Sequence, residues 1–508
     1  MSCLFQVYGL SQLKHDYYWP MGNDQSMDSG VQAFEFDFNE LPMEPSERDR
    51  FFSFDRCIGS ICDSEGKLLF YTNGCFIADS NHERMENGDS LNYNNYYELR
   101  LNEGCEFGYP SKQDLTILPD PGYDKGYYII HKPNKIRDTT EVPYYTTSEE
   151  IFLSYVDMSL NNGLGKVTTK RDTLISVKYL QGSHMTAINH DDGESWWILQ
   201  PSLTPTGNMY YRMLLDETGI AKVDSQAIGP QFIPEIWPTK SRSGGHSKFS
   251  QDGTMYAYFN LYDGLHLYDF DRETGLLSNG RYLEWAPMAW YNQAGSVEFS
   301  PNSKFLYLVN QYELFQIDLA IEDLSEGIHK IADADTSIID PFTMTFFMMS
   351  LGPDCKIYIR PGSSTNVMST IHNPNGRGQE CDLRQADLVL PRTSSAGGFP
   401  NFPPFRVDEE NKCDPSISMV DGFKVFWRRD LSIYPSPAST STTVDIPEGM
   451  RGWLCVLDML GHRVWQEEKV TGRATIDLST LPEGIYSVEF LPEDNVERVV
   501  YTAALVKN

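Results

Sequence analysis

The stretches "FSQDGTMYAYFN" (Phe249–Asn260) and "FSPNSKFLYLVN" (Phe299–Asn310) share one pattern, a tight turn followed by a short apolar run. "CDSEGKLLFYTNG" (Cys62–Gly74) repeats the pattern near the start of the chain. Asp, Asn, Pro and Gly are the residues that turns demand, and short runs rich in Tyr, Phe, Leu and Val are typical of strands. Because no window longer than about ten residues holds a helical period, the sequence predicts an all-β chain.

These turns recur along most of the chain. Equivalent points lie about 50 to 70 residues apart, near the ~40–50 residues of a propeller blade plus its loops; they are Gly66, residues 121–125, Gly193, Gly253, Ser303 and Cys355. A small twisted sheet cannot cover its own two apolar faces, but radial packing lets each sheet cover its neighbour. We therefore predict a β-propeller of about seven four-stranded blades. Cys355 replaces the usual Gly, so we expect a distorted turn there.

Composition narrows the class of protein. Of 508 residues, 40% are hydrophobic and 13% aromatic, which is ample for a folded β core. Lys and Arg number 41 against 71 Asp and Glu, a net charge of −30 that disfavours nucleic acid as a partner. No stretch approaches the ~20 apolar residues of a transmembrane helix, so we expect no transmembrane segment.

Nine cysteines, an odd number without CxxC spacing, argue against a zinc site. They fit buried thiols, or an occasional disulfide in an exported protein, with Cys75–Cys105 the first pair to test. We expect no cofactor and no bound metal.

The chain divides into four parts by texture. Residues 1–30 form an N-terminal segment, read either as the remnant of a signal peptide or as an ordinary first strand. Residues 31–408 carry the propeller pattern, and 409–430 are polar and read as a linker. From residue 431 to 508, some seven short strands joined by tight turns predict a small immunoglobulin-like β-sandwich.

The C-terminal part resembles the type A sorting domain of the type IX secretion system of Bacteroidetes. The resemblance rests on four ordered motifs: "LSIYPSPAS" from Leu431, "VLDMLGHRVWQ" from Val456, "IDLSTLPEGIYSVEF" from Ile476 and the terminal "ALVKN". The matching motif residues are Tyr434, Pro435, Pro437, Asp458, Gly461, Leu481, Pro482, Gly484, Tyr486 and Lys507. The family usually has Asn where this chain has Ser436, so we expect a weakened turn there. The resemblance implies export across the outer membrane, with the type IX machinery as partner of residues 431–508 and a secreted or cell-surface location.

The larger part resembles uncharacterised propeller-like (WD40-like) proteins that commonly precede this signal. The resemblance rests on pieces spread over residues 50–405, among them "ICDSEGKLLFYTNG", "VEFSPNSKFLYL", "LGPDCKIYI" and "GGFPNF". It implies the fold and no particular activity.

The sequence offers no constellation that identifies an enzyme. "FSQDG" lacks the Asp-x-Gly of a sialidase Asp-box, and "YDFDRETG" (268–275) lacks the ligand order of a Ca²⁺ loop. Five histidines fall near strand ends and could meet in a central channel; they are His131, His184, His190, His246 and His372. We expect Trp196 and Trp197 to pack on opposite faces of a strand rather than to form a sugar platform. We assign no catalytic residue.

The leading hypothesis is an exported propeller that acts as a non-catalytic binding module for a glycan or a protein. One alternative is a glycosidase, which needs two carboxylates facing each other across a sugar. Another is a structural adhesin or gliding-surface component.

Overall fold

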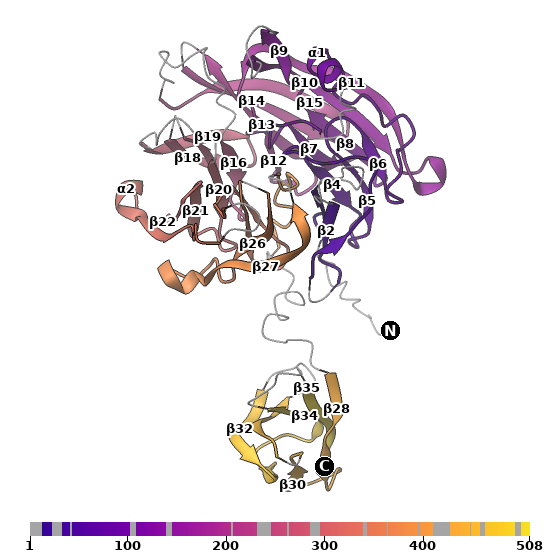
Figure 1. Cartoon of the computed structure of the whole chain (residues 1–508), viewed down its shortest axis with the longest axis vertical. Coiled ribbons are helices and arrows are strands. Elements are labelled where there is room, and N and C mark those ends of the chain that lie inside the picture. Colours follow the sequence, from indigo (N-terminus) through magenta and orange to yellow (C-terminus); the bar gives the residue numbers. More distant parts are fainter. Residues whose placement is uncertain are drawn as a thin grey trace, which may run out of the picture. The chain divides into compact units, whose positions relative to one another are not determined.

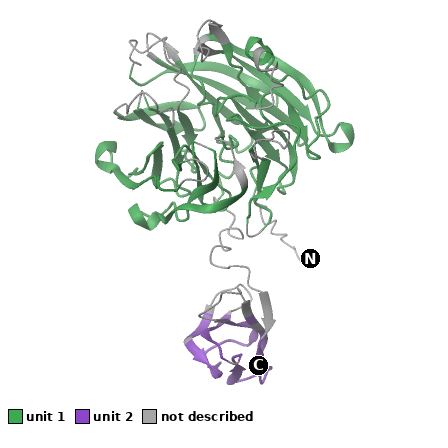
Figure 2. Cartoon of the chain, in the orientation of Figure 1, with its two compact units in different colours: residues 1–415 green, residues 416–508 purple. Residues whose placement is uncertain are grey.

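The computed structural model describes residues 13–22, 33–40, 43–101, 108–138, 145–204, 207–230, 245–261, 264–284, 295–338, 343–362, 364–394, 397–409, 427–447, 449–457, 463–492 and 499–508. The chain divides into two compact units, residues 1–415 and 416–508 (Figure 2). Both are built from strands, and the two described α-helices are short: α1 (Asn95–Leu101) and α2 (Leu324–Gly327).

The larger unit consists of small antiparallel sheets around a common centre (Figure 1). Two have three described strands each: β1 (Tyr18–Gly22), β2 (Ala33–Asp37) and β3 (Ser46–Glu47), then β4 (Gly59–Cys62), β5 (Leu68–Thr72) and β6 (Ile77–Asp79). Three sheets have four strands each, in chain order. The first is β16 (His246–Phe249), β17 (Met255–Asn260), β18 (Gly264–Asp271) and β19 (Leu276–Leu283), and the second is β20 (Gly295–Phe299), β21 (Phe305–Asn310), β22 (Glu313–Asp318) and β23 (Ile328–Asp333). The third is β24 (Met348–Leu351), β25 (Ile357–Arg360), β26 (Thr365–Ile371) and β27 (Leu383–Ser394).

The remaining sheet has nine strands and contains two four-stranded groups. The first group is β7 (Leu115–Pro119), β8 (Gly126–His131), β10 (Tyr145–Asp157) and β11 (Lys166–Leu180), with β9 (Lys135–Asp138) beside β10. The second is β12 (Thr186–Asn189), β13 (Trp196–Thr204), β14 (Gly207–Asp216) and β15 (Gly219–Ala227). One residue pair, Leu180 with Ser202, joins the groups. The ring is therefore an all-β, propeller-like fold, although the two sheets nearest the N-terminus have three described strands rather than four.

The repeated turn has the same hydrogen bonds in the sheet β16–β19 and in the sheet β20–β23. Ser250 Oγ accepts from the N–H of Met255, the N–H of Gly253 donates to the carbonyl of Ser250, and φ of Gly253 is +72°. In the next sheet Ser300, Ser303 and Phe305 make the same two bonds, with φ of Ser303 at +56°. The sequence thus sets where each hairpin reverses.

The turn at Cys355 reverses the chain without a glycine at position 355 but closes one residue sooner: the Gly352 N–H donates to the Lys356 carbonyl, whereas the Ser250 N–H donates to the carbonyl of Met255, five residues on. The Cys355 N–H donates to the Gly352 carbonyl at 3.0 Å, as in the other turns. Cys355 takes φ of +66°, a conformation that a side chain tolerates at a cost of about 1–2 kcal/mol.

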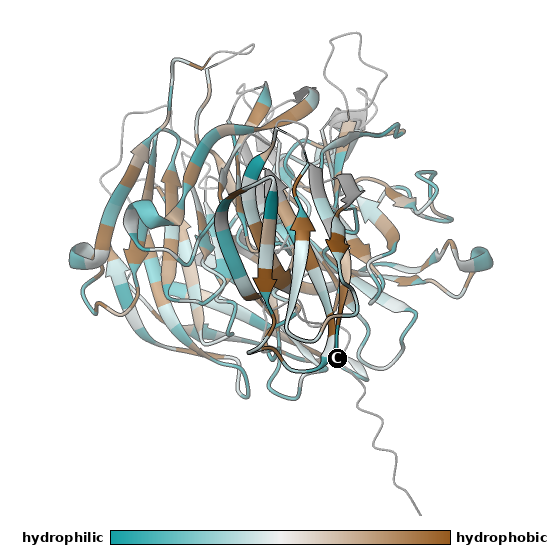
Figure 3. Cartoon of the chain, turned by 90° about the horizontal axis from the view of Figure 1, so that it is seen from below, coloured by the Kyte–Doolittle hydropathy of each residue, from teal (hydrophilic) through white to brown (hydrophobic). Residues whose placement is uncertain are grey.

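Successive residues of the middle strands enter different cores, which explains why the turn-and-strand pattern repeats. In β17, Tyr256 and Tyr258 pack toward β12–β15, while Ala257 and Phe259 pack toward β20–β23. The strand β21 divides its side chains in the same way between the sheets on its two sides. Figure 3 shows hydrophobic bands along many of the strands. Each inner sheet is stable because neighbours cover both its faces.

The first and last sheets of this unit meet and close the ring. The outer strand β27 contacts β2 and β3, and β1 contacts β4. Trp19 in β1 is fully buried, and its ring lies edge-on to Tyr358 of β25, with centroids 5.7 Å apart. The predicted start of the propeller at residue 31 is therefore too late: β1 lies within the predicted N-terminal segment but pairs with β2.

The smaller unit is a two-layer sandwich. One sheet orders β28 (Trp427–Asp430), β35 (Val499–Lys507), β34 (Gly484–Pro492), β31 (Arg451–Leu457) and β32 (Arg463–Thr471); the other orders β29 (Ser432–Tyr434), β30 (Ser441–Asp445) and β33 (Arg473–Asp477). The two sheets share one core, which includes Val444, Leu454, Ile476, Val488 and Leu505. The predicted linker ends too late, because its last four residues form β28, a parallel partner of β35.

Four described cysteines are free thiols: Cys57, Cys62, Cys381 and Cys455. Cys75 and Cys355 each take part in a disulfide bond. Cys105 lies outside the described residues, so the pair Cys75–Cys105 stays a prediction. Within the described ranges, no helix is long and apolar enough to cross a membrane.

Candidate functional site

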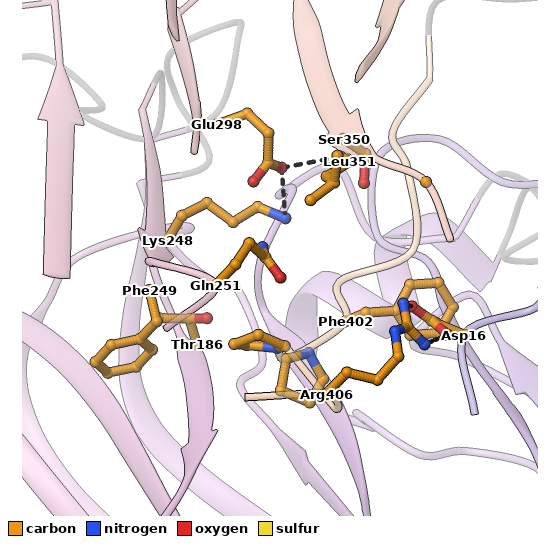
Figure 4. Close-up of a pocket in the computed structure, with 13 residues that line it drawn as sticks. Asp16, Thr186, Lys248, Phe249, Gln251, Glu298, Ser350, Leu351, Phe402 and Arg406 are labelled. Atoms are coloured by element: carbon orange, nitrogen blue, oxygen red, sulfur yellow. Dashed lines mark hydrogen bonds and ion pairs between the residues drawn. The ribbon is translucent and has the colours of Figure 1, made fainter. Parts of the chain in front are cut away.

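The innermost strands of the ring surround a polar cavity near its axis (Figure 4). The innermost strand comes first in each sheet, and β12, β16, β20 and β24 lie next to one another in that order. The last residues of β16, β20 and β24 form one side of a small hollow that water can enter, with a volume of about 30 Å³, and the segment 402–406 forms the other side. We call this hollow the axial cavity; it is lined by Asp16, Thr186, Lys248, Phe249, Gln251, Glu298, Ser350, Leu351, Gly352, Phe402, Pro403, Pro404 and Arg406.

An ion pair between adjacent innermost strands forms one wall of the axial cavity. Lys248 Nζ lies 3.0 Å from Glu298 Oε2, and both side chains are nearly buried. The same carboxylate oxygen accepts from the N–H of Leu351 at 3.2 Å, and Oε1 accepts from the N–H of Phe299 at 3.2 Å. Glu298 is therefore held by three donors from three consecutive segments of the ring.

A second ion pair forms the opposite wall. Arg406 binds Asp16 through two hydrogen bonds of 2.7 Å, the bidentate geometry that suits guanidinium and carboxylate. Arg406 also donates to the carbonyl of Leu13. These contacts tie the N-terminal end of the propeller unit to its C-terminal end, across 390 residues of sequence.

The two carboxylates of the axial cavity, Asp16 and Glu298, are both used as hydrogen-bond acceptors. A glycosidase needs one carboxyl group free to give a proton to the leaving oxygen and another free to attack or to activate water. Here each group holds a cation instead. Hydroxyl and amide groups of Thr186, Ser350 and Gln251 complete the polar part of the lining.

The rest of the axis is filled by the chain itself. Asn401 donates to the carbonyls of Leu115 and Met185, both at 2.9 Å, and accepts from Gln113 Nε2 at 3.0 Å. Its own N–H donates to the carbonyl of Ile58. The segment 397–409 thus passes among four parts of the ring before it reaches the axial cavity, and we call it the axial segment.

A fully buried ion pair lies beside Asn401. Lys132 Nζ is 3.1 Å from Asp114 Oδ1, and neither side chain is exposed. Lys132 also donates to the carbonyls of Gln181 and Ser183 and to Gln200 Oε1. Burial lowers the pKa of Lys132, and Asp114 offsets only part of this effect.

The histidines do not gather in the channel. His184 and His246 approach the axis, where each Nδ1 lies 3.0 Å from a serine hydroxyl, of Ser247 and Ser296 respectively. His131 is buried in β8 between Asn92 and Ser154. His190 follows the innermost strand β12 and contacts the Glu273 carbonyl, and His372 follows β26 and contacts the Asp387 carboxylate. Within the described part of the chain, no three His, Cys, Asp or Glu side chains are grouped to hold a metal ion.

Two other sequence features prove structural. In "YDFDRETG", Asp271 caps the hairpin by accepting from Glu273 N and from the Thr274 hydroxyl. Trp197 packs in the core between sheets and donates to the Arg272 carbonyl, while Trp196 turns the other way toward Phe405. The prediction of opposite faces for the two tryptophans is confirmed.

The smaller unit brings described parts of all four sorting motifs together, since Val456 of the second motif pairs with Val488 of the third. Gly484 pairs with Lys507, and Ala438 forms a bridge to the same residue. Ser436 Oγ donates to the Ala504 carbonyl and accepts from the N–H of Val506, both at 3.2 Å. The turn that we expected to be weakened by Ser436 is thus anchored to β35.

Among the remaining motif residues, Tyr434, Pro435, Pro437 and Pro482 are exposed, Leu481 is half-buried, and Tyr486 is buried with its hydroxyl donating to the Pro482 carbonyl at 2.8 Å. Asp458 and Gly461 lie outside the described residues. Ile485, which lies within the third motif, is 54% exposed. We call the exposed residues Tyr434, Pro435, Pro437, Gly484 and Ile485 the motif patch.

Residues 432–501 match the family model described as "Secretion system C-terminal sorting domain". No curated protein matches the chain. Among solved structures, a protein of Lactobacillus plantarum is 13% identical over 76% of this chain and 99% of its own, with a TM-score of 0.42. The extracellular domain of a one-component system of B. thetaiotaomicron is 11% identical over 98% of this chain and 57% of its own (TM-score 0.41), and the Dos1 propeller is 10% identical over 69% and 90% (TM-score 0.36). These similarities are too weak to indicate an activity, whereas the C-terminal match identifies a sorting domain of a secreted or cell-surface protein.

Proposed function

We propose that this protein is an exported, non-catalytic binding module, delivered to the cell exterior by its C-terminal sorting domain and binding a glycan or protein ligand through the propeller unit. The single observation that carries the binding role is the axial cavity, a polar hollow whose carboxylates are both engaged by cations. Rigid rings with pockets near the axis suit recognition, because the scaffold holds the lining groups in place.

We also propose seven blades and an immunoglobulin-like sandwich. Seven innermost strands support the blade number: β1, β4, β7, β12, β16, β20 and β24. The bond from the Tyr486 hydroxyl to the Pro482 carbonyl supports the sandwich class, since a tyrosine bonded a few residues upstream recurs in such folds.

Export is tested by following the chain with and without residues 416–508 in a cell that carries a type IX system. We expect the shortened chain to stay inside the cell. We further expect Ile485→Asp to reduce export, because it places a charge in the motif patch. Trp453→Asp, on the same sheet and 42% exposed, is the matched control. Unchanged secretion of the shortened chain would refute the sorting role.

Binding is tested on glycan and protein arrays with the full chain. Thr186→Val and Gln251→Ala remove polar groups from the axial cavity without breaking either ion pair, and we expect both to weaken binding. Thr218→Val, the same change in an exposed hairpin, should have no effect. Turnover of a polysaccharide that is lost in Glu298→Gln or Asp16→Asn would instead establish the glycosidase alternative.

A further inference from the structure

A second polar site lies at the other end of the ring's axis. Arg56 comes shortly before β4, Lys112 shortly before β7, and Phe347 immediately before β24. The innermost strands run side by side in the same sense, so the residues that precede them meet at one end. The axial cavity lies where β16, β20 and β24 finish, which is the opposite end.

The two cations at this end share one aromatic ring. Lys112 Nζ is 4.1 Å from the centroid of the Phe347 ring, and Arg56 Cζ is 5.1 Å from the same centroid. Both distances are within the range of a cation–π contact. An ammonium and a guanidinium therefore both lie near the same aromatic ring.

Among the described residues, neither cation has a carboxylate within hydrogen-bonding distance. Lys112 is 2% exposed, and its ammonium donates to the Gly295 carbonyl at 3.1 Å; it makes no ion pair with any residue that the structure describes. Arg56 has one carboxylate near it, Asp55, at 3.8 Å from Nε. That Nε atom is buried and makes no hydrogen bond.

This shortage of counter-charge contrasts with the composition of the chain. The protein has 30 more acidic than basic charges, so carboxylates are plentiful elsewhere on it. A buried cation without a partner is costly, and two cations repel one another. Burial lowers the pKa of Lys112 well below its ordinary value, and the charge of Arg56 lowers it further. An anion between the two groups would offset both penalties.

We propose that Arg56 and Lys112 form a subsite for an oxyanion, the carboxylate or sulfate group of an acidic glycan. The guanidinium, whose side chain is 35% exposed, is the open end of the subsite, and the buried ammonium is its inner end. Charged donors of this kind make the strongest hydrogen bonds to carboxylate and sulfate oxygens. The subsite rests on the proposed binding function and adds to it a second site, at the other end of the axis, for acidic saccharides.

The test is calorimetric titration of the full chain with sodium sulfate, sodium glucuronate and sodium chloride at matched ionic strength. We expect one of the two oxyanions to bind, which also tells sulfate from carboxylate. Lys112→Met and Arg56→Gln should each lower its affinity about tenfold or more, as expected for loss of a charge-assisted hydrogen bond. Lys330→Met, an exposed lysine paired with Glu313, is the control and should bind as the wild type does.

Stability provides a second measurement. Because Lys112→Met removes a buried charge without a partner, it should keep or raise the thermal midpoint in the absence of sulfate or glucuronate, and abolish the increase that the bound oxyanion gives the wild type. Arg56→Gln, at a half-exposed position, decides the matter if Lys112→Met does not fold. The proposal is overturned if neither oxyanion binds, or if both variants bind as the wild type does. Array binding of neutral glycans that is insensitive to Arg56→Gln would overturn it while leaving the binding function standing.

Discussion

Replacing Asp114 by Asn should be among the most destabilising single changes in the propeller unit. Its carboxylate lies 3.1 Å from Lys132 Nζ, and both side chains are fully buried. At an effective dielectric constant of about 20, this attraction is worth about 5 kcal/mol. Lys132 keeps its bonds to the Gln181 and Ser183 carbonyls and to Gln200 in the variant, so we expect a loss of about 3–5 kcal/mol in the free energy of unfolding.

The double variant Asp114→Asn/Lys132→Met tests the reasoning. Burial lowers the pKa of Lys132 even beside Asp114, so the charged ammonium lowers the free energy of unfolding. Replacing Lys132 by Met should therefore recover part of the stability that Asp114→Asn loses. The sign for pH follows: a lysine whose folded pKa is lowered costs stability below that pKa, and the cost disappears as the pH rises toward 10.5. Asp114→Asn alone should therefore recover stability between neutral pH and about pH 10. The assay is urea unfolding of the full chain followed by tryptophan fluorescence, and a double variant less stable than Asp114→Asn would refute the argument.

Three further predictions concern His131, Gly253 and Cys75. Burial lowers the pKa of His131 to about 3, so the folded state takes up fewer protons than the unfolded one, and stability should fall by about 1.4 kcal/mol per unit as the pH drops from about 6.5 to 3; His131→Asn should flatten this dependence in unfolding experiments at several pH values. Gly253→Ala should cost more than Gly193→Ala in the free energy of unfolding, because both have positive φ but only the first places its Cβ within 2.6 Å of a neighbouring side chain; equal costs would contradict this. Cys75 should appear in one disulfide-linked peptide with Cys105 when the unreduced protein is digested and analysed by mass spectrometry, and a link to another cysteine would rule the pair out.

The inner strands could be predicted from the sequence, and the outer ones largely could not. The apolar runs that follow the turns in "FSQDGTMYAYFN" and "FSPNSKFLYLVN" coincide with β17 and β21. Their apolar residues alternate between two cores, which leaves a clear signal in the sequence. The outer strand β15 has the sequence GIAKVDSQA and is exposed or half-buried along its length. Polar and charged residues are therefore interspersed in it, and it lacks the continuous apolar run that predicts a strand.

The axial cavity was not predicted, although the repeats contained a signal for part of it. Lys248 in "HSKFS" and Glu298 in "SVEFS" hold the same position before the repeated Phe-Ser, as aligned repeats would have shown. Asp16 and Arg406 lie 390 residues apart and outside any repeat, so only the closed ring brings them together. The oxyanion subsite escapes sequence analysis for the same reason, since Arg56, Lys112 and Phe347 come from three different sheet connections.

The position of Asn401 has a consequence for how the protein is made. A ribosome synthesises this residue after every strand of the ring, yet the carbonyls of Ile58, Leu115 and Met185 depend on it for their hydrogen bonds. Until then the nascent ring has a gap at its centre, and its first and last sheets lack the clasp between Asp16 and Arg406. The axial segment is synthesised after all the strands of the ring, so the ring can close only when the chain is complete to about residue 409.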